Sequence, residues 1–312
     1  MAFDGIVIAN LVKDLNDKIV SGRISKIAQP EKDELLLTIK GNRENFRLLI
    51  SANASLPLLY FTETNKPSPL TAPNFCMLLR KHIANGRIVS VSQPGLERIV
   101  RIEIEHLDEM GDLKRKFLIV ELMGKHSNII FCDDENKILD SIKHISAQVS
   151  SVREVLPGRE YFIPHAGEKK DPLTITEEEF KELIGKTPQN LSKALYTDLT
   201  GLSPTVSAEL CHLASLDGDI SAKDFSDSEL THLYHAFTWI MDDVRQGNFT
   251  PNIIYQKEKP VEFASIPLSM FSGGDYRSVS FPSISALLER YYAERNTVSR
   301  IHQKSTDLRK IL

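Results

Sequence analysis

Short strand-like segments separated by turn signals dominate the first half of this chain, and they restrict it to folds built around a sheet of hairpins. The clearest segment covers residues 100–105, where apolar side chains alternate strictly with Arg101, Glu103 and Glu105. Such alternation is typical of a strand with one buried face and one solvated face. Residues 35–37 are three consecutive leucines, which is the pattern of a strand covered on both faces.

Two helices are expected beside these strands. Asp4 is placed to cap an opening helix whose apolar residues recur at helical spacing as far as Ile19. Residues 75–88 read FCMLLRKHIANGRI, which predicts a short amphipathic helix closed by Gly86. The expected strands cover residues 23–28, 34–40, 45–52, 58–62, 88–92, 99–105, 114–122, 127–132 and 138–143. Helices joined to hairpin-spaced strands predict an α+β domain over residues 1–172.

Residues 173–282 carry mostly helical patterns and form a second predicted domain. Thr176 and Glu179 make a capping box that opens a helix. Helices are expected at residues 177–184, 190–199, 204–215 and 228–247, with a short strand pair within residues 252–267. The turn that contains Gly201 and Ser203 resembles a helix-hairpin-helix module, in which turn amides and the next helix N-terminus receive a phosphate. A plain helical hairpin with a glycine C-cap is the alternative.

A heptad pattern covers the third predicted part, residues 283–312. Seven of its nine a and d positions are apolar; these positions are Ile284, Leu287, Tyr291, Glu294, Val298, Ile301, Ser305, Leu308 and Leu312. The pattern indicates the beginning of a coiled coil that is cut off at the chain end, and its basic flanks suit a rod that passes near RNA. An ordinary terminal helix docked on the core is the alternative.

Composition places the chain among ordinary globular proteins. Its 312 residues are 41% hydrophobic and 26% charged, with no apolar run long enough to span a membrane and no signal-peptide pattern at the start. The three cysteines lie far apart in apolar contexts, which predicts reduced core thiols in a cytoplasmic protein. The nine histidines are not grouped at metal-ligand spacing, and neither a phosphate-binding loop nor a nucleophile motif occurs. We therefore expect no catalytic residues, no metal and no cofactor.

Basic residues gather in residues 64–102 of an otherwise acidic chain. This segment has six lysines and arginines and one acid, Glu97, so its formal charge is +5 in a protein of net charge −4. Such a concentration is typical of a local site for a polyanion. Arg80, Lys81 and Arg87 are free to point outward from the expected amphipathic helix. For a lone charge cluster, a solvated helix face is the alternative.

Two short motifs carry side chains suited to RNA. Arg98 can pair with phosphate in a bidentate manner or stack on an unpaired base, and Glu97 can accept from a base edge or orient Arg98. A surface ion pair at a strand start is the alternative. The turn at residues 124–128 offers Lys125, His126 and Asn128, whose ammonium, imidazole and amide groups can bind phosphate. A hydrogen-bonded hairpin loop is the alternative there.

Longer motifs are distributed along the whole chain. They are MAFDG at the start, FCMLLRKHIANGRI, QPGLERI at residues 93–99, VELMGKHSNIIF at 120–131, LPGREY at 156–161, GLSP at 201–204 and ERYYAERNTVSRIHQKSTDLRK at 289–310. Together, in order and at fitting spacing, they resemble the NFACT family of bacterial RqcH (also called fibronectin-binding protein A) and eukaryotic NEMF. The resemblance implies an NFACT-N domain, similar in fold to the N-terminal domain of formamidopyrimidine-DNA glycosylases, followed by a hairpin module and a coiled coil.

The resemblance also implies a translation factor without an active site of its own. The family acts on large ribosomal subunits that hold an obstructed nascent chain on a peptidyl-tRNA. It recruits an elongator tRNA, alanyl in bacteria, and the ribosome's own peptidyl-transferase centre adds an untemplated tail that marks the chain for degradation. The family usually has Asp-Arg in the QPGLERI motif, a pair implicated in tRNA handling. Here the pair is Glu97-Arg98, so the carboxylate lies one methylene further out.

Two other functions compete with this one. Glycosylase chemistry requires an N-terminal proline amine with a glutamate beside it, and this chain begins Met1-Ala2-Phe3, so we reject that activity. A surface adhesin that binds fibronectin or fibrinogen, the activity behind the family's older name, would require export, for which the sequence shows no signal or anchor. Sedimentation with large ribosomal subunits, as opposed to recovery outside the cell, distinguishes the two.

Overall fold

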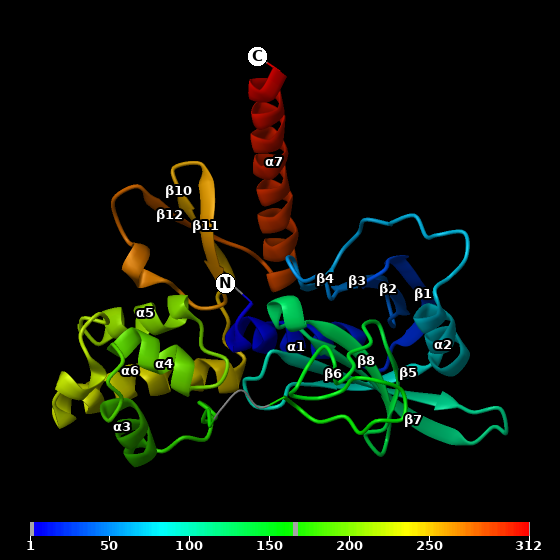
Figure 1. Ribbon diagram of the computed structural model, residues 1–312, viewed down its shortest axis with the longest axis horizontal. Coiled ribbons are helices and arrows are strands. Elements are labelled where there is room, and N and C mark those ends of the chain that lie inside the picture. Colours follow the sequence, from blue (N-terminus) through cyan, green and yellow to red (C-terminus); the bar gives the residue numbers. More distant parts are fainter. Residues whose placement is uncertain (1–2, 165–167, 312) are drawn as a thin grey trace. The chain divides into compact units, whose positions relative to one another are not determined.

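The computed structural model describes residues 3–164 and 168–311, and it divides the chain into two compact units (Figure 1). The first, here the sheet unit, consists of Phe3–Ile175 and Thr197–Gly201. The second, here the helical unit, contains Thr176–Tyr196 and Leu202–Leu312. Glycosylase chemistry was rejected from the first residues of the sequence, and two of these, Met1 and Ala2, lie outside the described residues.

An antiparallel sheet forms the core of the sheet unit. Among the described residues it has nine strands in the order β4-β3-β2-β1-β5-β6-β7-β8-β9. The strands are β1 (Arg23–Glu31), β2 (Glu34–Lys40), β3 (Asn45–Ser51), β4 (Leu58–Phe61), β5 (Arg87–Ser92), β6 (Ile99–Leu107), β7 (Leu113–Glu121), β8 (Asn128–Asp133) and β9 (Ile138–Ser141). Each predicted strand is present, and the mixed α+β character is confirmed. Hairpins explain this order, since neighbours in sequence are mostly neighbours in the sheet.

Burial along the strands agrees with the sequence patterns. Val100, Ile102 and Ile104 are at most 1% exposed, whereas the charged residues between them are half-buried. The consecutive leucines of β2 are at most 4% exposed, so this strand is covered on both faces as predicted.

Two helices pack on the sheet. In α1 (Gly5–Ile19), the Asp4 carboxylate accepts hydrogen bonds from the amides of Ile6 and Val7 at 3.1 and 2.9 Å, which confirms the predicted cap. Helix α1 contacts β5 and β6, and α2 (Asn74–Ile83) contacts β1, β6 and β9.

The predicted amphipathic helix is present, but it ends a little before Gly86. Helix α2 ends at Ile83, and Asn85 adopts the left-handed conformation with φ of 63°. Gly86 is required for a different reason: a Cβ there would lie 2.8 Å from Ile104 Cγ2. The glycine therefore permits close packing of the chain on β6, and the next residue begins β5.

The helical unit begins with the predicted capping box, in which the Thr176 hydroxyl accepts from the Glu179 amide at 3.2 Å. Its helices are α3 (Glu177–Gly185), α4 (Leu191–Asp198), which runs into the sheet unit, α5 (Pro204–Leu213) and α6 (Asp227–Gln246). The expected strand pair is present as β10 (Asn252–Gln256) and β11 (Lys259–Ala264).

The small sheet has a third strand that was not predicted from the sequence. Strand β12 (Tyr276–Ser280) pairs with β10, in the order β11-β10-β12. Its sequence, YRSVS, is mostly polar and largely exposed, so it carries no burial pattern. Backbone pairing with β10 produces this strand, and that pairing has no local sequence signal.

Helix α7 (Ile284–Ile311) combines the two alternatives considered for the heptad segment. Ile284, Leu287 and Leu288 are at most 1% exposed, and the Tyr291 ring packs on Phe263 with centroids 4.7 Å apart. Further along, Ile301 is 64% exposed. The helix is thus docked at its start and exposed later, and the coiled coil stays a prediction. The side chains of Val298 and Leu312 lie outside the described residues.

The cysteines agree with the expectation of core thiols. Cys76, Cys132 and Cys211 are buried and unpaired in the described structure. Burial raises the pKa of Cys132 to about 12 and that of Cys211 to about 11. None of the described helices is both long enough and apolar enough to cross a membrane.

Candidate nucleic-acid interface

Antiparallel pairing brings distant segments of the sheet unit to one end of the sheet. Ile99 at the start of β6 pairs with Glu121 at the end of β7, and Glu121 pairs with Asn128 at the start of β8. The Leu122 amide donates to the Arg98 carbonyl at 2.9 Å, which joins the two loops. Arg98 and the turn before Asn128, separated in sequence, therefore lie at the same sheet end.

A pocket of about 570 Å³ opens at this end of the sheet. Its basic lining residues are Arg98, Lys125, Lys143 and Arg153, with His126 beside them. Apolar side chains, including Val149 and Val152, form part of the wall, and none of the described lining residues carries a carboxylate. A concave, cationic surface with apolar patches suits an anionic ligand that also has flat apolar groups.

The loop that carries Arg98 is held against the start of α1. The Gln93 side-chain amide donates to the carbonyls of Gly5 and Glu97, both at 2.9 Å. Gly5 permits this contact because a Cβ there would lie 2.2 Å from the Leu96 carbonyl oxygen. The MAFDG and QPGLERI motifs are thus partners in one contact, and they fix the backbone just before Arg98.

Arg98 is half-buried, so the pair with Glu97 is not the exposed surface pair considered from the sequence. Burial lowers the pKa of the Arg98 guanidinium, while the nearby carboxylates of Asp4 and Glu97 raise it. Lys169 lies close by, and its pKa is lowered by burial and by the charge of Arg98. The carboxylates of Glu97 and Asp198 oppose the lowering of the Lys169 pKa, so the charges of Arg98 and Lys169 are each partly balanced by nearby acids.

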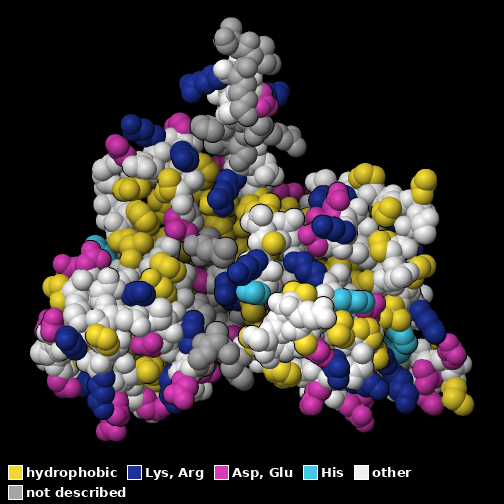
Figure 2. Space-filling view, viewed as in Figure 1, with side chains coloured by type: hydrophobic (Ala, Val, Ile, Leu, Met, Phe, Trp, Pro, Cys, Tyr) yellow, Lys and Arg dark blue, Asp and Glu magenta, His cyan; other side chains and the backbone are white. Residues whose placement is uncertain are grey.

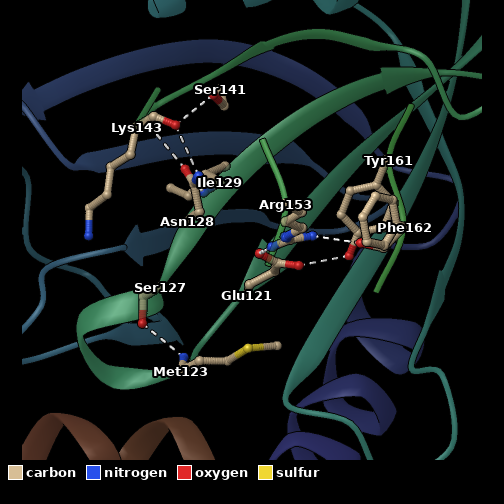
Figure 3. Close-up of polar contacts among 10 residues, drawn as sticks. All are labelled: Glu121, Met123, Ser127, Asn128, Ile129, Ser141, Lys143, Arg153, Tyr161 and Phe162. Carbon is tan, nitrogen blue, oxygen red and sulfur yellow. Dashed lines mark hydrogen bonds and ion pairs between the residues drawn. The ribbon is translucent and has the colours of Figure 1, made fainter. Parts of the chain in front are cut away.

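The turn between β7 and β8 presents two of the predicted side chains. It contains a 3-10 turn, η1 (Gly124–His126), and the buried Ser127 hydroxyl accepts from the Met123 amide at 2.9 Å (Figure 3). Lys125 and His126 are exposed on this turn and line the pocket. The loop is therefore hydrogen-bonded internally, as one alternative held. It also exposes the Lys125 ammonium and the His126 imidazole, as the phosphate-binding alternative requires.

Asn128 has a structural task that its sequence position did not reveal. It is 2% exposed, and its amide nitrogen donates to the Lys143 carbonyl at 3.0 Å. Its amide oxygen accepts from the amides of Ile129 and Lys143 at 2.9 and 3.1 Å (Figure 3). Asn128 itself lines the pocket, and through these bonds it holds Lys143, another lining residue, whose pKa is lowered by burial.

Alanine at Asn128 is expected to reduce the free energy of unfolding by about 1–3 kcal/mol, because buried backbone groups at Ile129 and Lys143 lose their partners. Urea denaturation followed by circular dichroism measures this. Asn45 at the start of β3 is an exposed match for Asn128 at the start of β8, and its alanine variant should stay within about 0.5 kcal/mol of wild type. Equal stability of the two variants would contradict the structural task of Asn128.

Arg153, which lines the pocket, belongs to a buried polar cluster with Glu121 and Tyr161 (Figure 3). Glu121 is fully buried, forms an ion pair with Arg153, and accepts from the Tyr161 hydroxyl at 2.9 Å. Arg153 also donates to the Phe162 carbonyl at 2.7 Å. Burial raises the pKa of Glu121, and the charge of Arg153 opposes that rise. Sequence reasoning missed this cluster; the signal was a carboxylate at the end of the apolar run of β7.

The other cations of residues 64–102 are dispersed. Arg80 donates to the Ile27 carbonyl at 2.9 Å, Lys81 lies 3.9 Å from Glu109, and Arg87 pairs with Glu105 at 2.7 Å. Lys66 pairs with Glu34 at 2.9 Å, and the Arg101 guanidinium lies 4.0 Å from the centre of the Phe117 ring. Of the basic residues in this segment, only Arg98 lines the pocket. The one-dimensional cluster is therefore not one surface, because hairpins send successive residues to different places.

The two predicted hairpin residues support the turn itself. Gly201 has φ of 79°, and its carbonyl accepts from the Gly5 amide at 2.7 Å within the sheet unit. Ser203 begins the next unit as the N-cap of α5, where its buried hydroxyl accepts from the Val206 amide at 3.2 Å. Neither residue lines the pocket. No group of three or more histidine, cysteine or acidic residues suited to a metal ion occurs in the described part of the chain.

Known proteins that resemble this chain point to one family. The family described as "NFACT N-terminal and middle domains" matches residues 4–312. The "Rqc2 homolog RqcH" of Bacillus subtilis (strain 168) is 35% identical over 313 residues, which cover 100% of this chain and 52% of that protein. The chain thus spans about half the length of this relative.

Two solved structures share the fold. A fibrinogen binding protein from Staphylococcus aureus superposes with a TM-score of 0.79 at 30% identity, covering 94% of this chain and 99% of that one. The N-terminal part of the fibronectin/fibrinogen-binding protein from Streptococcus suis has a TM-score of 0.76 at 30% identity, with the same coverage.

Proposed function

The chain belongs to the NFACT family, and from this premise we propose that it is the N-terminal part of a ribosome-associated quality control factor that binds tRNA. In this proposal the whole protein acts in the cytoplasm on obstructed large ribosomal subunits. It recruits a tRNA, alanyl in bacteria, for untemplated tailing of the stalled chain, while the ribosome catalyses the peptide bonds. The observation that carries the proposal is the pocket lined by Arg98, Lys125, Lys143 and Arg153 without a carboxylate.

The chemistry of the pocket supports RNA as its ligand. Lys125 and Lys143 provide ammonium groups for phosphates, and Arg98 provides a planar fork that can bind phosphate or stack on a base. Val149 and Val152 are 71% and 60% exposed, so they offer apolar surface to a splayed base. Single-stranded RNA loops combine both features, since their bases are unstacked and their backbone is accessible.

The remaining predicted residues take lesser parts in this proposal. Arg80, Lys81 and Arg87 add long-range positive charge and make no base contact, because they do not line the pocket. Residues 173–282 act as a helix-hairpin-helix domain whose turn at Gly201 and Ser203 meets a phosphate through backbone amides. Residues 283–312 begin the coiled coil.

Replacing Arg98 with alanine is expected to weaken tRNA binding by about 1–3 kcal/mol, and Arg98→Lys should rescue little because lysine lacks the planar fork. Filter binding or fluorescence anisotropy with purified tRNA over a series of salt concentrations measures both effects. The slope of log affinity against log salt should also fall by about 1 in the alanine variant.

Arg115→Ala is the matched control for this experiment. Arg115 is an arginine of the same unit that pairs with Glu103 at 2.7 Å and does not line the pocket, so its loss should leave tRNA affinity within about twofold of wild type. If both alanine variants bind tRNA equally well, general charge explains binding and the pocket does not.

The competing function is adhesion to fibronectin or fibrinogen, which rests on the names of the two similar structures. Fractionation of cells that carry the full-length protein separates the two functions. If the protein is a quality control factor, we expect to find it on large ribosomal subunits. We also expect Arg98→Ala to reduce the tailing of stalled chains. A protein found at the cell surface and absent from ribosomes would favour adhesion.

A further inference from the structure

A groove of about 460 Å³ lies on the helical unit, beside the only tryptophan of the chain. Trp239 is 77% exposed, and Leu213 across the groove is 46% exposed. Large apolar side chains are seldom left this exposed together on a soluble surface, and tryptophan is enriched where partners bind. The feature belongs to the other compact unit from the cationic pocket, so the tRNA proposal does not account for it.

One face of α6 forms a wall of the groove. The residues that contribute to it recur at helical spacing: His232, His235, Ala236, Trp239, Ile240 and Asp243. The end of α5 and the Ile266–Pro267 segment complete the groove. Just after that segment, the buried Glu209 carboxylate accepts from the amides of Ser269 and Met270 at 2.8 and 2.9 Å.

The groove lining carries acidic side chains and no basic ones. Glu209 and Asp243 line it, and none of the described lining residues is a lysine or an arginine. On the helical unit, at the lower left of Figure 2, acidic side chains (magenta) are interspersed with basic ones (dark blue). The Glu209 carboxylate is bonded within the fold, which leaves Asp243 as the acidic group of the groove wall. A carboxylate without a neighbouring cation in the lining disfavours phosphate there and favours a cationic partner.

We propose that this groove is a docking site for a basic protein segment that inserts an apolar side chain beside Trp239. Two features select this occupant. The exposed apolar pair Trp239 and Leu213 favours an apolar anchor, and a lining that contains Asp243 but no described lysine or arginine favours positive flanks. Nucleic acid fits poorly because its backbone is anionic.

The single tryptophan provides a direct test in the full chain. The probe is a short amphipathic helical peptide of leucine and lysine; its leucine and glutamate counterpart and purified tRNA serve as comparisons. The lysine peptide should shift Trp239 emission to shorter wavelength in a saturable manner and bind at least about tenfold more tightly than the glutamate peptide. An equal shift with the glutamate peptide, a shift with tRNA, or no shift with any probe would overturn the proposal.

Variants separate groove binding from general charge attraction. Ala236→Glu places a larger side chain in the groove and should weaken binding of the labelled lysine peptide at least about tenfold by anisotropy. Ile220→Glu is the matched control, since Ile220 is 44% exposed in the same unit but does not line the groove; it adds the same charge and should not weaken binding. Equal affinity of the two variants would place the peptide elsewhere and overturn the proposal. Thermal melts confirm that both variants are folded.

Discussion

Replacing Glu121 with alanine is expected to lower the free energy of unfolding of the sheet unit by about 3–5 kcal/mol. The Arg153 side chain is 10% exposed and pairs with a carboxylate that has no exposed surface. Removal of that carboxylate leaves a buried cation without its counter-charge and the Tyr161 hydroxyl without its acceptor. Such a loss far exceeds the value of a surface pair, because water cannot replace the missing partner.

Chemical denaturation followed by far-ultraviolet circular dichroism measures the loss at Glu121. Trp239 fluorescence serves as an internal control because it reports the helical unit. Asp17→Ala removes a surface pair with Lys13, whose side chains are 61% and 48% exposed, and should cost at most about 0.5 kcal/mol. A cost at Glu121 as small as at Asp17 would show that the buried cluster does not stabilise the fold. We also expect Glu121→Ala to weaken tRNA binding, since Arg153 loses its orientation at the pocket.

The Gly201→Ala substitution is expected to cost about 3–5 kcal/mol, which combines backbone strain with steric overlap. Gly201 has φ of 79°, and a Cβ there would lie 2.0 Å from the Leu96 carbonyl oxygen. The carbonyl oxygen is a backbone atom and the position of a Cβ is fixed by the backbone, so no side-chain rotation relieves the overlap. Because Leu96 belongs to the loop that precedes Arg98, the variant should lose tRNA affinity as well as stability.

Gly111→Ala separates strain from overlap. Gly111 has a similar φ of 84°, but nothing lies within 4 Å of a Cβ built there. Its alanine variant should cost only about 1–2 kcal/mol, the penalty of the left-handed conformation alone. The difference between the two variants in urea midpoint measures the overlap at Leu96, and equal midpoints would contradict the close contact.

The candidate site was predictable only in part. Four residues were identified from the sequence because they stand in short motifs, and the structure brings them to one pocket: Arg98, Lys125, His126 and Asn128. Lys143 and Arg153 line the same pocket but have no motif around them. The basic residues within 64–102 are close in sequence but do not form one surface, because the hairpins between strands place successive residues on different parts of the unit.

The sequence by itself determined the strands β1–β9, the caps at Asp4 and Thr176, and membership in the NFACT family. These features are recorded in adjacent residues, as side-chain alternation, helical spacing and capping chemistry, and each can be read locally. Tertiary structure alone decided which polar groups are buried together. Arg153 and Tyr161 meet Glu121 from 32 and 40 residues away, and Asn128 holds Lys143 from 15 residues away. Such pairs depend on strand register and on the path of long loops, which no local pattern encodes, so their roles became visible only when the sheet was assembled.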